Sequence, residues 1–191
     1  MISSETFHVV TTELVVGAFS VAGLCFSLCL LVHLGILKQP TWASALDHVA
    51  HFTLAFGLAA TPFAILSGLS SAPGEGLNSP ILVNKMLLSM TGFGFALGCL
   101  ISRWRLGKRV WGSKKSISLH GASGLAACGM MLLTASAGGT FSRGESLLDV
   151  FHLPYEQVLL FPLLISLISL LLGVTMLVIG WKRMSEISSI H

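Results

Sequence analysis

Charged residues are scarce in this chain. Asp, Glu, Lys and Arg together make up 10% of its 191 residues, whereas 53% of the residues are hydrophobic and the mean hydropathy is +0.85. A soluble domain carries roughly 25% charged residues. The deficit therefore excludes an ordinary soluble domain and is typical of an integral membrane protein.

The sequence also lacks the motifs of the common catalytic classes. It has no G-x-S-x-G, no H-E-x-x-H, no P-loop and no dinucleotide fingerprint. Its four cysteines lie inside apolar runs without a C-x-x-C or C-x-x-C-H pattern, so c-type haem attachment and zinc ribbons are unsupported. We interpret these cysteines as small packing residues. Any catalysis is expected only as a redox subunit of a larger oxidoreductase.

What the chain does contain is a set of long apolar runs. A helix needs about 20 residues to cross a bilayer, and a single run must satisfy its backbone polar groups internally. Five runs reach this length: Leu14–Leu37, Ala45–Ser70, Ile81–Trp104, Ile117–Ala137 and Gln157–Trp181. The sequence thus predicts an all-α protein, in which residues 1–191 form a single bundle of five transmembrane helices. The N-terminal residues lack a basic segment, so we expect the first run to be a retained span and not a cleaved signal peptide.

Basic residues orient this predicted bundle. Six of the eleven basic residues lie at the end of the third run or between it and the fourth: Arg103, Arg105, Lys108, Arg109, Lys114 and Lys115. The positive-inside rule makes that loop cytoplasmic, and alternation then places the N-terminus outside and the C-terminus inside. We expect a multi-pass protein of the plasma (inner) membrane of a prokaryote. Membrane topology is a sufficient reason for the basic loop, so no nucleic-acid partner is expected.

Four histidines are expected at one depth of this bundle. By helical rise, His33, His48, His51 and His120 lie within roughly 5–10 Å of the inner boundary, on three different helices. Imidazole is poorly solvated by hydrocarbon, so such a cluster needs a partner. In a helical bundle that partner is often a haem iron.

We predict that one haem b lies between the second and fourth spans. His51 and His120 are the favoured ligands because each is the deepest candidate on its helix, and His48 and His33 are second choices. The small residues Gly121 and Gly124 are expected to open a slot for the porphyrin.

The prediction also assigns partners to the haem propionates and leaves other roles open for the histidines. Arg103 and Arg105 are expected to pair with the haem propionates. If the centre is a metal without porphyrin, with His51 and His120 as metal ligands, copper or iron suits imidazole. Structural roles stay open for His48 as a hydrogen-bonded residue at a helix end and for His33 as a donor to a neighbouring helix.

The outer side of the bundle holds other polar residues. His8 and His152 are expected mainly as interface residues, although they could line a second, outer site with Glu13 or Lys85. Snorkelling to the headgroups is sufficient to explain Lys85.

Two resemblances follow from these residues. With few spans, histidines on separate helices and basic residues near them, the chain resembles the b-type cytochrome membrane subunits of respiratory complexes. The His48-x-x-His51-Phe52 opening of a span, Gly68 at its end and Thr134-x-x-x-Gly138-Gly139 make it similar also to a family of uncharacterised four-helix prokaryotic membrane proteins. That likeness covers roughly residues 45–144. It departs from the family at Val49, where a proline usually follows the first histidine. The resemblance implies a haem-binding role.

These observations predict a membrane-embedded electron-transfer subunit that exchanges electrons with a quinone pool inside a larger respiratory complex. Its partners are expected to be the lipid bilayer, other subunits of that complex and a quinone. Two alternatives stay open. The chain could be a non-catalytic structural subunit of a membrane complex, or it could transport copper or another metal.

Overall fold

The computed structural model describes residues 3–38, 40–71, 78–145 and 149–150, and also residues 164, 167–168, 171–175 and 178–179. Most of the described residues are helical, with no strand among them, which confirms the all-α prediction. Four α-helices and one short 3-10 helix make up the ordered elements of residues 3–145: α1 (Ser4–His33), α2 (Pro40–Ser71), α3 (Pro80–Leu106), η1 (Gly107–Trp111) and α4 (Lys114–Arg143).

Each of the four α-helices has the length and apolar composition to cross a membrane. The fifth predicted span, Gln157–Trp181, falls mostly outside the described residues, so it stays a prediction, as do the orientation and the site of insertion.

The helices begin and end where local chemistry allows. The Ser3 hydroxyl accepts a hydrogen bond from the Thr6 amide, so α1 starts ten residues before the predicted span. It also ends earlier, at His33, and Gly35 follows with φ +77°, which a glycine adopts without strain. Likewise, the Ser113 hydroxyl caps α4, and Gly144 ends that helix at φ +71°.

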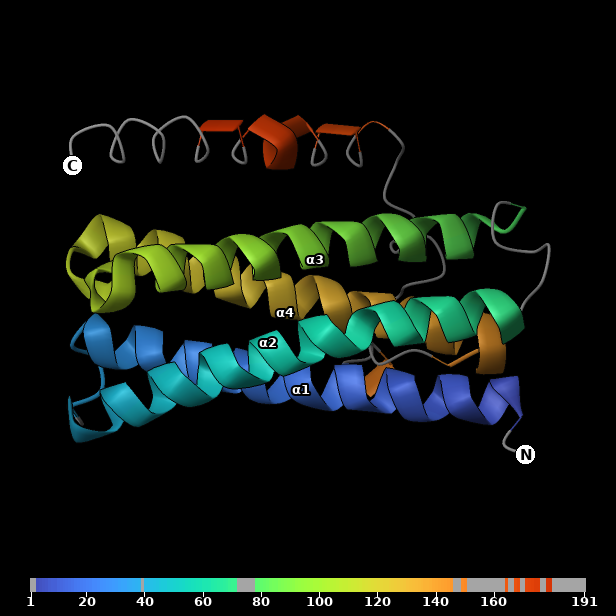
Figure 1. Cartoon of the computed structure of the whole chain (residues 1–191), viewed down its shortest axis with the longest axis horizontal. Coiled ribbons are helices and arrows are strands. Elements are labelled where there is room, and N and C mark those ends of the chain that lie inside the picture. Colours follow the sequence, from blue (N-terminus) through green and yellow to red (C-terminus); the bar gives the residue numbers. More distant parts are fainter. Residues whose placement is uncertain are drawn as a thin grey trace.

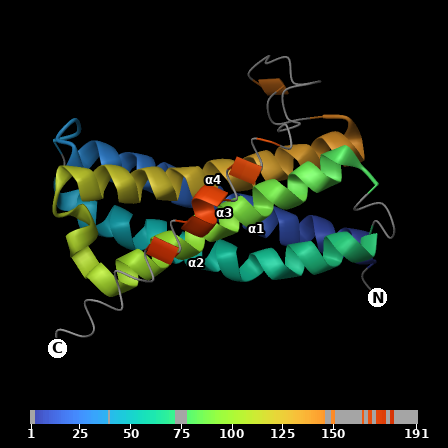
Figure 2. The ribbon, with the colours of Figure 1, turned by 90° about the horizontal axis from the view of Figure 1, so that it is seen from above.

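The four α-helices run antiparallel in sequence and lie side by side (Figure 1). The α1–α2 turn and the α3–η1–α4 connection lie at the same end of the bundle, as alternation of the spans requires (Figures 1 and 2). Helix α1 packs on both α2 and α4, while α3 packs mainly on α4. Large apolar side chains fill the centre, with Phe19, Phe26 and Leu54 fully buried.

Candidate metal centre

Two histidines from separate helices meet inside the bundle. His51 of α2 and His120 of α4 stack with an interplanar angle of 14° and ring centroids 5.1 Å apart. Their Nε2 atoms are only 2.9 Å apart. His120 is 5% exposed, and the His51 side chain is 11% exposed. His51 and His120, which the sequence analysis favoured because of their depth in the predicted spans, therefore lie in contact.

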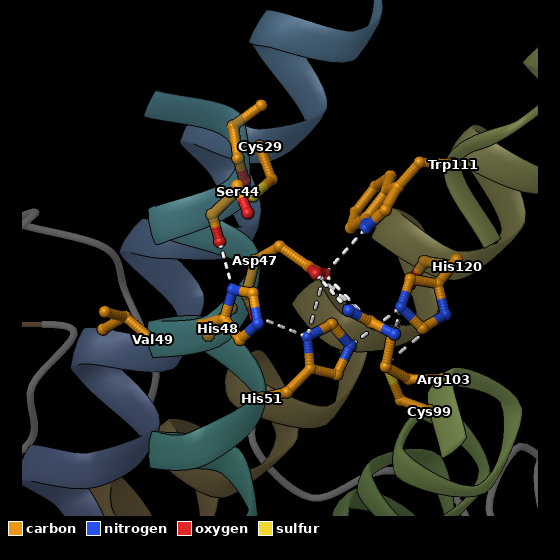
Figure 3. Close-up of polar contacts among 12 residues, drawn as sticks. Cys29, Ser44, Asp47, His48, Val49, His51, Cys99, Arg103, Trp111 and His120 are labelled. Carbon is orange, nitrogen blue, oxygen red and sulfur yellow. Dashed lines mark hydrogen bonds and ion pairs between the residues drawn. The ribbon is translucent and has the colours of Figure 1, made fainter. Parts of the chain in front are cut away.

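The buried carboxylate of Asp47 contacts His51 on the side of the ring away from His120. Asp47 lies one helical turn earlier on α2, and residues four apart share a helix face. The Nδ1 atom of His51 is 2.7 Å from the main-chain oxygen of Asp47 and 3.2 Å from its carboxylate Oδ1. This contact fixes the ring so that Nε2 points toward His120 (Figure 3).

Asp47 is in turn held by two residues of the α3–η1 segment. The Arg103 guanidinium donates to both carboxylate oxygens, with Nη2 2.6 Å from Oδ2 and Nε 3.1 Å from Oδ2 and 3.2 Å from Oδ1. The indole Nε1 of Trp111 donates to Oδ1 over 2.8 Å. Asp47 is only 2% exposed. Burying a carboxylate is costly unless it is paired and hydrogen-bonded, and these contacts to Asp47 offset that cost.

The His120 side is built from α3. The Nδ1 atom of His120 is 3.1 Å from the Ser102 hydroxyl, and that hydroxyl donates to the main-chain oxygen of Cys99 over 2.8 Å. The Cys99 sulfur, from a residue that is 1% exposed, lies 3.7 Å from both ring nitrogens of His120. Helices α2, α3 and α4 therefore all contribute to one buried cluster.

Aromatic rings close the cluster off from its surroundings. Phe26 of α1 meets His51 and His120 edge-on, with centroids 5.1 and 6.0 Å away. Trp111 meets His120 edge-on at 5.0 Å and stacks on His33 at 4.6 Å. Edge-to-face contacts of this kind restrict ring rotation, so both imidazoles are held in place.

Of the other residues proposed for the site, His33 and His48 are not brought to the pair. His33 contacts the Cys29 main-chain oxygen through Nδ1 at 2.9 Å and stacks on Trp111. His48 is exposed, and its Nδ1 contacts the Ser44 main-chain oxygen at 2.5 Å. Their helix phases direct the two rings to other faces, although their depth is similar.

The prediction that Arg103 and Arg105 pair with haem propionates stays untested, but the structure gives both side chains other partners. Arg103 is occupied by Asp47, and Arg105 is exposed and lies over the Trp104 ring, 5.8 Å from its centroid.

The expected porphyrin slot is filled by α1. A Cβ added at Gly121 would lie 2.5 Å from Leu30, and one added at Gly124 would lie 2.7 Å from the Phe26 ring. These glycines thus permit close packing of α4 on α1. Axial imidazoles, moreover, need about 4 Å between their Nε2 atoms, with the iron at about 2 Å from each. The side chains as arranged do not fit a haem between His51 and His120, and haem binding stays an untested prediction.

At the opposite end of the bundle, His8 joins a small polar cluster. Its Nδ1 is 3.1 Å from the Ser67 hydroxyl, which is also 3.1 Å from the Thr11 hydroxyl. The ammonium of Lys85 lies against Gly138, 3.0 Å from where a Cβ would stand. His152 lies outside the described residues.

Sequence reasoning missed Asp47, Cys99 and Trp111 as members of the site. A signal for Asp47 was present, since it is the single carboxylate inside the five predicted spans and precedes His51 by one turn. Cys99 likewise precedes Arg103 by one turn. Nothing in the linear order indicates that these two pairs face each other.

Comparison of the chain with protein-family models, curated proteins and solved structures finds no match in any of the three. The resemblances drawn from short motifs therefore stay predictions, and function has to be argued from the site.

The cluster has the donor set of a metal centre. The ligand atoms of His51, Cys99 and His120 all lie within 4.8 Å of one another. Imidazole and thiolate together suit copper, zinc and iron. Asp47 contacts Nδ1 of His51, and the Ser102 hydroxyl contacts Nδ1 of His120. Hydrogen-bond partners of this kind orient metal-binding histidines.

Proposed function

We propose that this chain is a membrane-embedded electron-transfer subunit that holds one redox-active transition metal at His51 and His120. The observation that carries the proposal is the convergence of the two Nε2 atoms at 2.9 Å, with each Nδ1 fixed by a separate partner. Metal-binding histidines are oriented in this way, since the bond at one ring nitrogen sets the tautomer and aims the other.

Burial supports electron transfer over chemistry on a substrate. The three candidate ligands lie among Phe26, Trp111 and the backbones of α2, α3 and α4, and Cys99 and His120 are at most 5% exposed. A bond-making reaction needs an open coordination position that a substrate can reach. Transfer of a single electron needs no such opening.

The apolar centre of the bundle argues against metal transport. Between the cluster and the His8 end lie fully buried Phe19, Ala22 and Leu54. The Thr61 hydroxyl is bonded to the Gly57 oxygen of its own helix. No other buried imidazole or carboxylate lies along this route among the described residues, so an ion leaving the cluster would lose its imidazole ligands without a like replacement.

Electron transfer requires a donor and an acceptor. The proposal therefore includes a quinone and other subunits of a respiratory complex as partners, as expected from the sequence. The metal gives or takes one electron at a time. A quinone takes two electrons and two protons to form the quinol, so two metal oxidations are needed for each quinone reduced.

The test is redox spectroscopy and metal analysis on the full chain purified in mild detergent. We expect a stoichiometric transition metal and a difference spectrum between dithionite-reduced and air-oxidised protein. His51→Ala and His120→Ala should each abolish both, and His48→Ala is the matched control because that ring faces away from the pair. Protein that is folded, carries neither metal nor haem and gives a flat spectrum would refute the proposal and favour the structural-subunit alternative.

A further inference from the structure

The hydrogen bonds around His51 determine which of its nitrogens carries the proton. A main-chain carbonyl oxygen only accepts hydrogen bonds. The Asp47 carbonyl oxygen is 2.7 Å from Nδ1 of His51, so Nδ1 is the protonated nitrogen and donates. In the neutral ring, Nε2 then carries a lone pair.

The same reasoning applies to His120 through Ser102. A serine hydroxyl has one hydrogen, and that of Ser102 is donated to the Cys99 main-chain oxygen. The hydroxyl oxygen therefore accepts from Nδ1 of His120 at 3.1 Å, which again leaves a lone pair on Nε2. With this assignment two lone pairs face each other over 2.9 Å, an arrangement that a cation between the two Nε2 atoms stabilises.

We infer that the cation is a single copper ion, held as Cu(I) without porphyrin by Nε2 of His51, Nε2 of His120 and the thiolate of Cys99. The inference rests on the proposed function, since it names the metal and the third ligand of the same centre. Thiolate sulfur is the soft ligand that selects Cu(I), and a His2Cys set is the donor set of copper electron-transfer sites.

Two of the three distances between ligand atoms suit such an ion. With metal–nitrogen and metal–sulfur lengths of about 2.05 and 2.3 Å, the observed 3.7 Å between Cys99 Sγ and His120 Nε2 corresponds to an angle at the metal of about 115°. The 2.9 Å between the Nε2 atoms corresponds to about 90°, and opening to a tetrahedral angle requires only about 0.4 Å more separation.

Charge balance distinguishes Cu(I) from the other candidate cations. The Asp47 carboxylate and the Arg103 guanidinium already neutralise each other. A Cu(I) ion with one thiolate adds no net charge, whereas Zn²⁺ with one thiolate, or a proton shared by the imidazoles beside a neutral thiol, adds one positive charge. An uncompensated charge is costly in a buried apolar site. Oxidation to Cu(II) releases one electron and leaves that charge until the next electron arrives.

The experiment is an anaerobic titration of the metal-free full chain with Cu(I) in competition with bicinchoninate, in mild detergent. We expect one copper per chain. Cys99→Ser should weaken binding by more than the roughly 10–100-fold expected for an outer partner such as Ser102→Ala. Cys25→Ser is the matched control, because Cys25 is also buried but lies outside the ligand group. Circular dichroism verifies that each variant is folded.

Spectroscopy of the oxidised protein adds a second measurement. We expect a thiolate-to-copper charge-transfer band in the visible range and a Cu(II) paramagnetic resonance signal, and Cys99→Ser should remove the band.

Three results would overturn the copper assignment. The purified protein could contain haem in place of copper, zinc could bind at one per chain and resist displacement by Cu(I), or Cys99→Ser could bind Cu(I) as tightly as the unaltered chain. Bound haem would refute the copper assignment but not the proposed electron-transfer function. Folded protein without any metal would refute both the copper assignment and the electron-transfer function.

Discussion

Removing the charge of Asp47 tests how the site is held together. In Asp47→Asn the amide oxygen still accepts from Trp111, but the Arg103 guanidinium loses its counter-ion. Breaking a buried ion pair by removing one partner costs about 3–5 kcal/mol. The Arg103 side chain is 20% exposed and lies near one end of the bundle, so part of its charge can be solvated. We therefore expect a loss of about 3 kcal/mol, at the lower end of that range.

A double-mutant cycle separates the ion pair from general disruption. Arg103→Gln alone should also cost about 3 kcal/mol, since it leaves the carboxylate with Trp111 and His51 only. The double variant should lose about as much as either single variant, which gives a coupling energy of about 3 kcal/mol. The assay is unfolding in mixed dodecyl-maltoside and SDS micelles, followed by circular dichroism. Additive losses, or an Asp47→Asn variant within about 0.5 kcal/mol of the unaltered chain, would show that the pair does not organise the site.

Three more predictions address packing, the indole bond and topology. Gly124→Ala should cost about 1–3 kcal/mol of unfolding free energy because the new methyl group meets a phenylalanine ring of α1, whereas Gly129→Ala, with open space beside it, should be neutral or stabilising by up to about 1 kcal/mol in the same micelle assay. Trp111→Phe keeps the ring contacts but removes a donor to Asp47, so a loss of about 1.5–3 kcal/mol is expected, and an unchanged unfolding midpoint would contradict the indole bond. A cysteine at Lys108 should react with a membrane-impermeant maleimide in inside-out vesicles only, and reaction in right-side-out vesicles would invert the predicted topology.

The course of the helices and one half of the site could be predicted from the sequence. Apolar runs located four helices, because a run of about 20 apolar residues is long enough to cross a bilayer as one helix. Depth along the predicted spans singled out His51 and His120, since helical rise is uniform. Depth did not predict that the His48 ring lies outside the cluster. The direction of a ring depends on the rotation of its helix, and that rotation is set by packing against neighbouring helices.

The rest depended on contacts between distant segments. Asp47 and Arg103 are 56 residues apart, and each is unremarkable beside its own neighbours. Cys99 has the apolar context of an ordinary packing residue and becomes a candidate ligand only through the position of His120. Gly121 and Gly124 illustrate the opposite error. Small residues open a space in a helix surface, but they do not determine whether a cofactor or a neighbouring helix fills it.

The contact between Asp47 and the α3–η1 segment has a consequence for biosynthesis. The ribosome makes Asp47 well before Arg103 and Trp111, so α2 leaves the ribosome with a carboxylate that has no counter-ion. On insertion scales, an acidic residue at the centre of a span costs about 2.5–3.5 kcal/mol, and the cost is smaller for Asp47 because it lies near the start of α2. If α2 crosses a membrane, as its length and composition allow, the unpaired carboxylate would weaken its insertion until the hairpin of α3 and α4 is made. If the spans insert in the order of translation, the second hairpin would bring the counter-ion of Asp47 and so strengthen the insertion of the first.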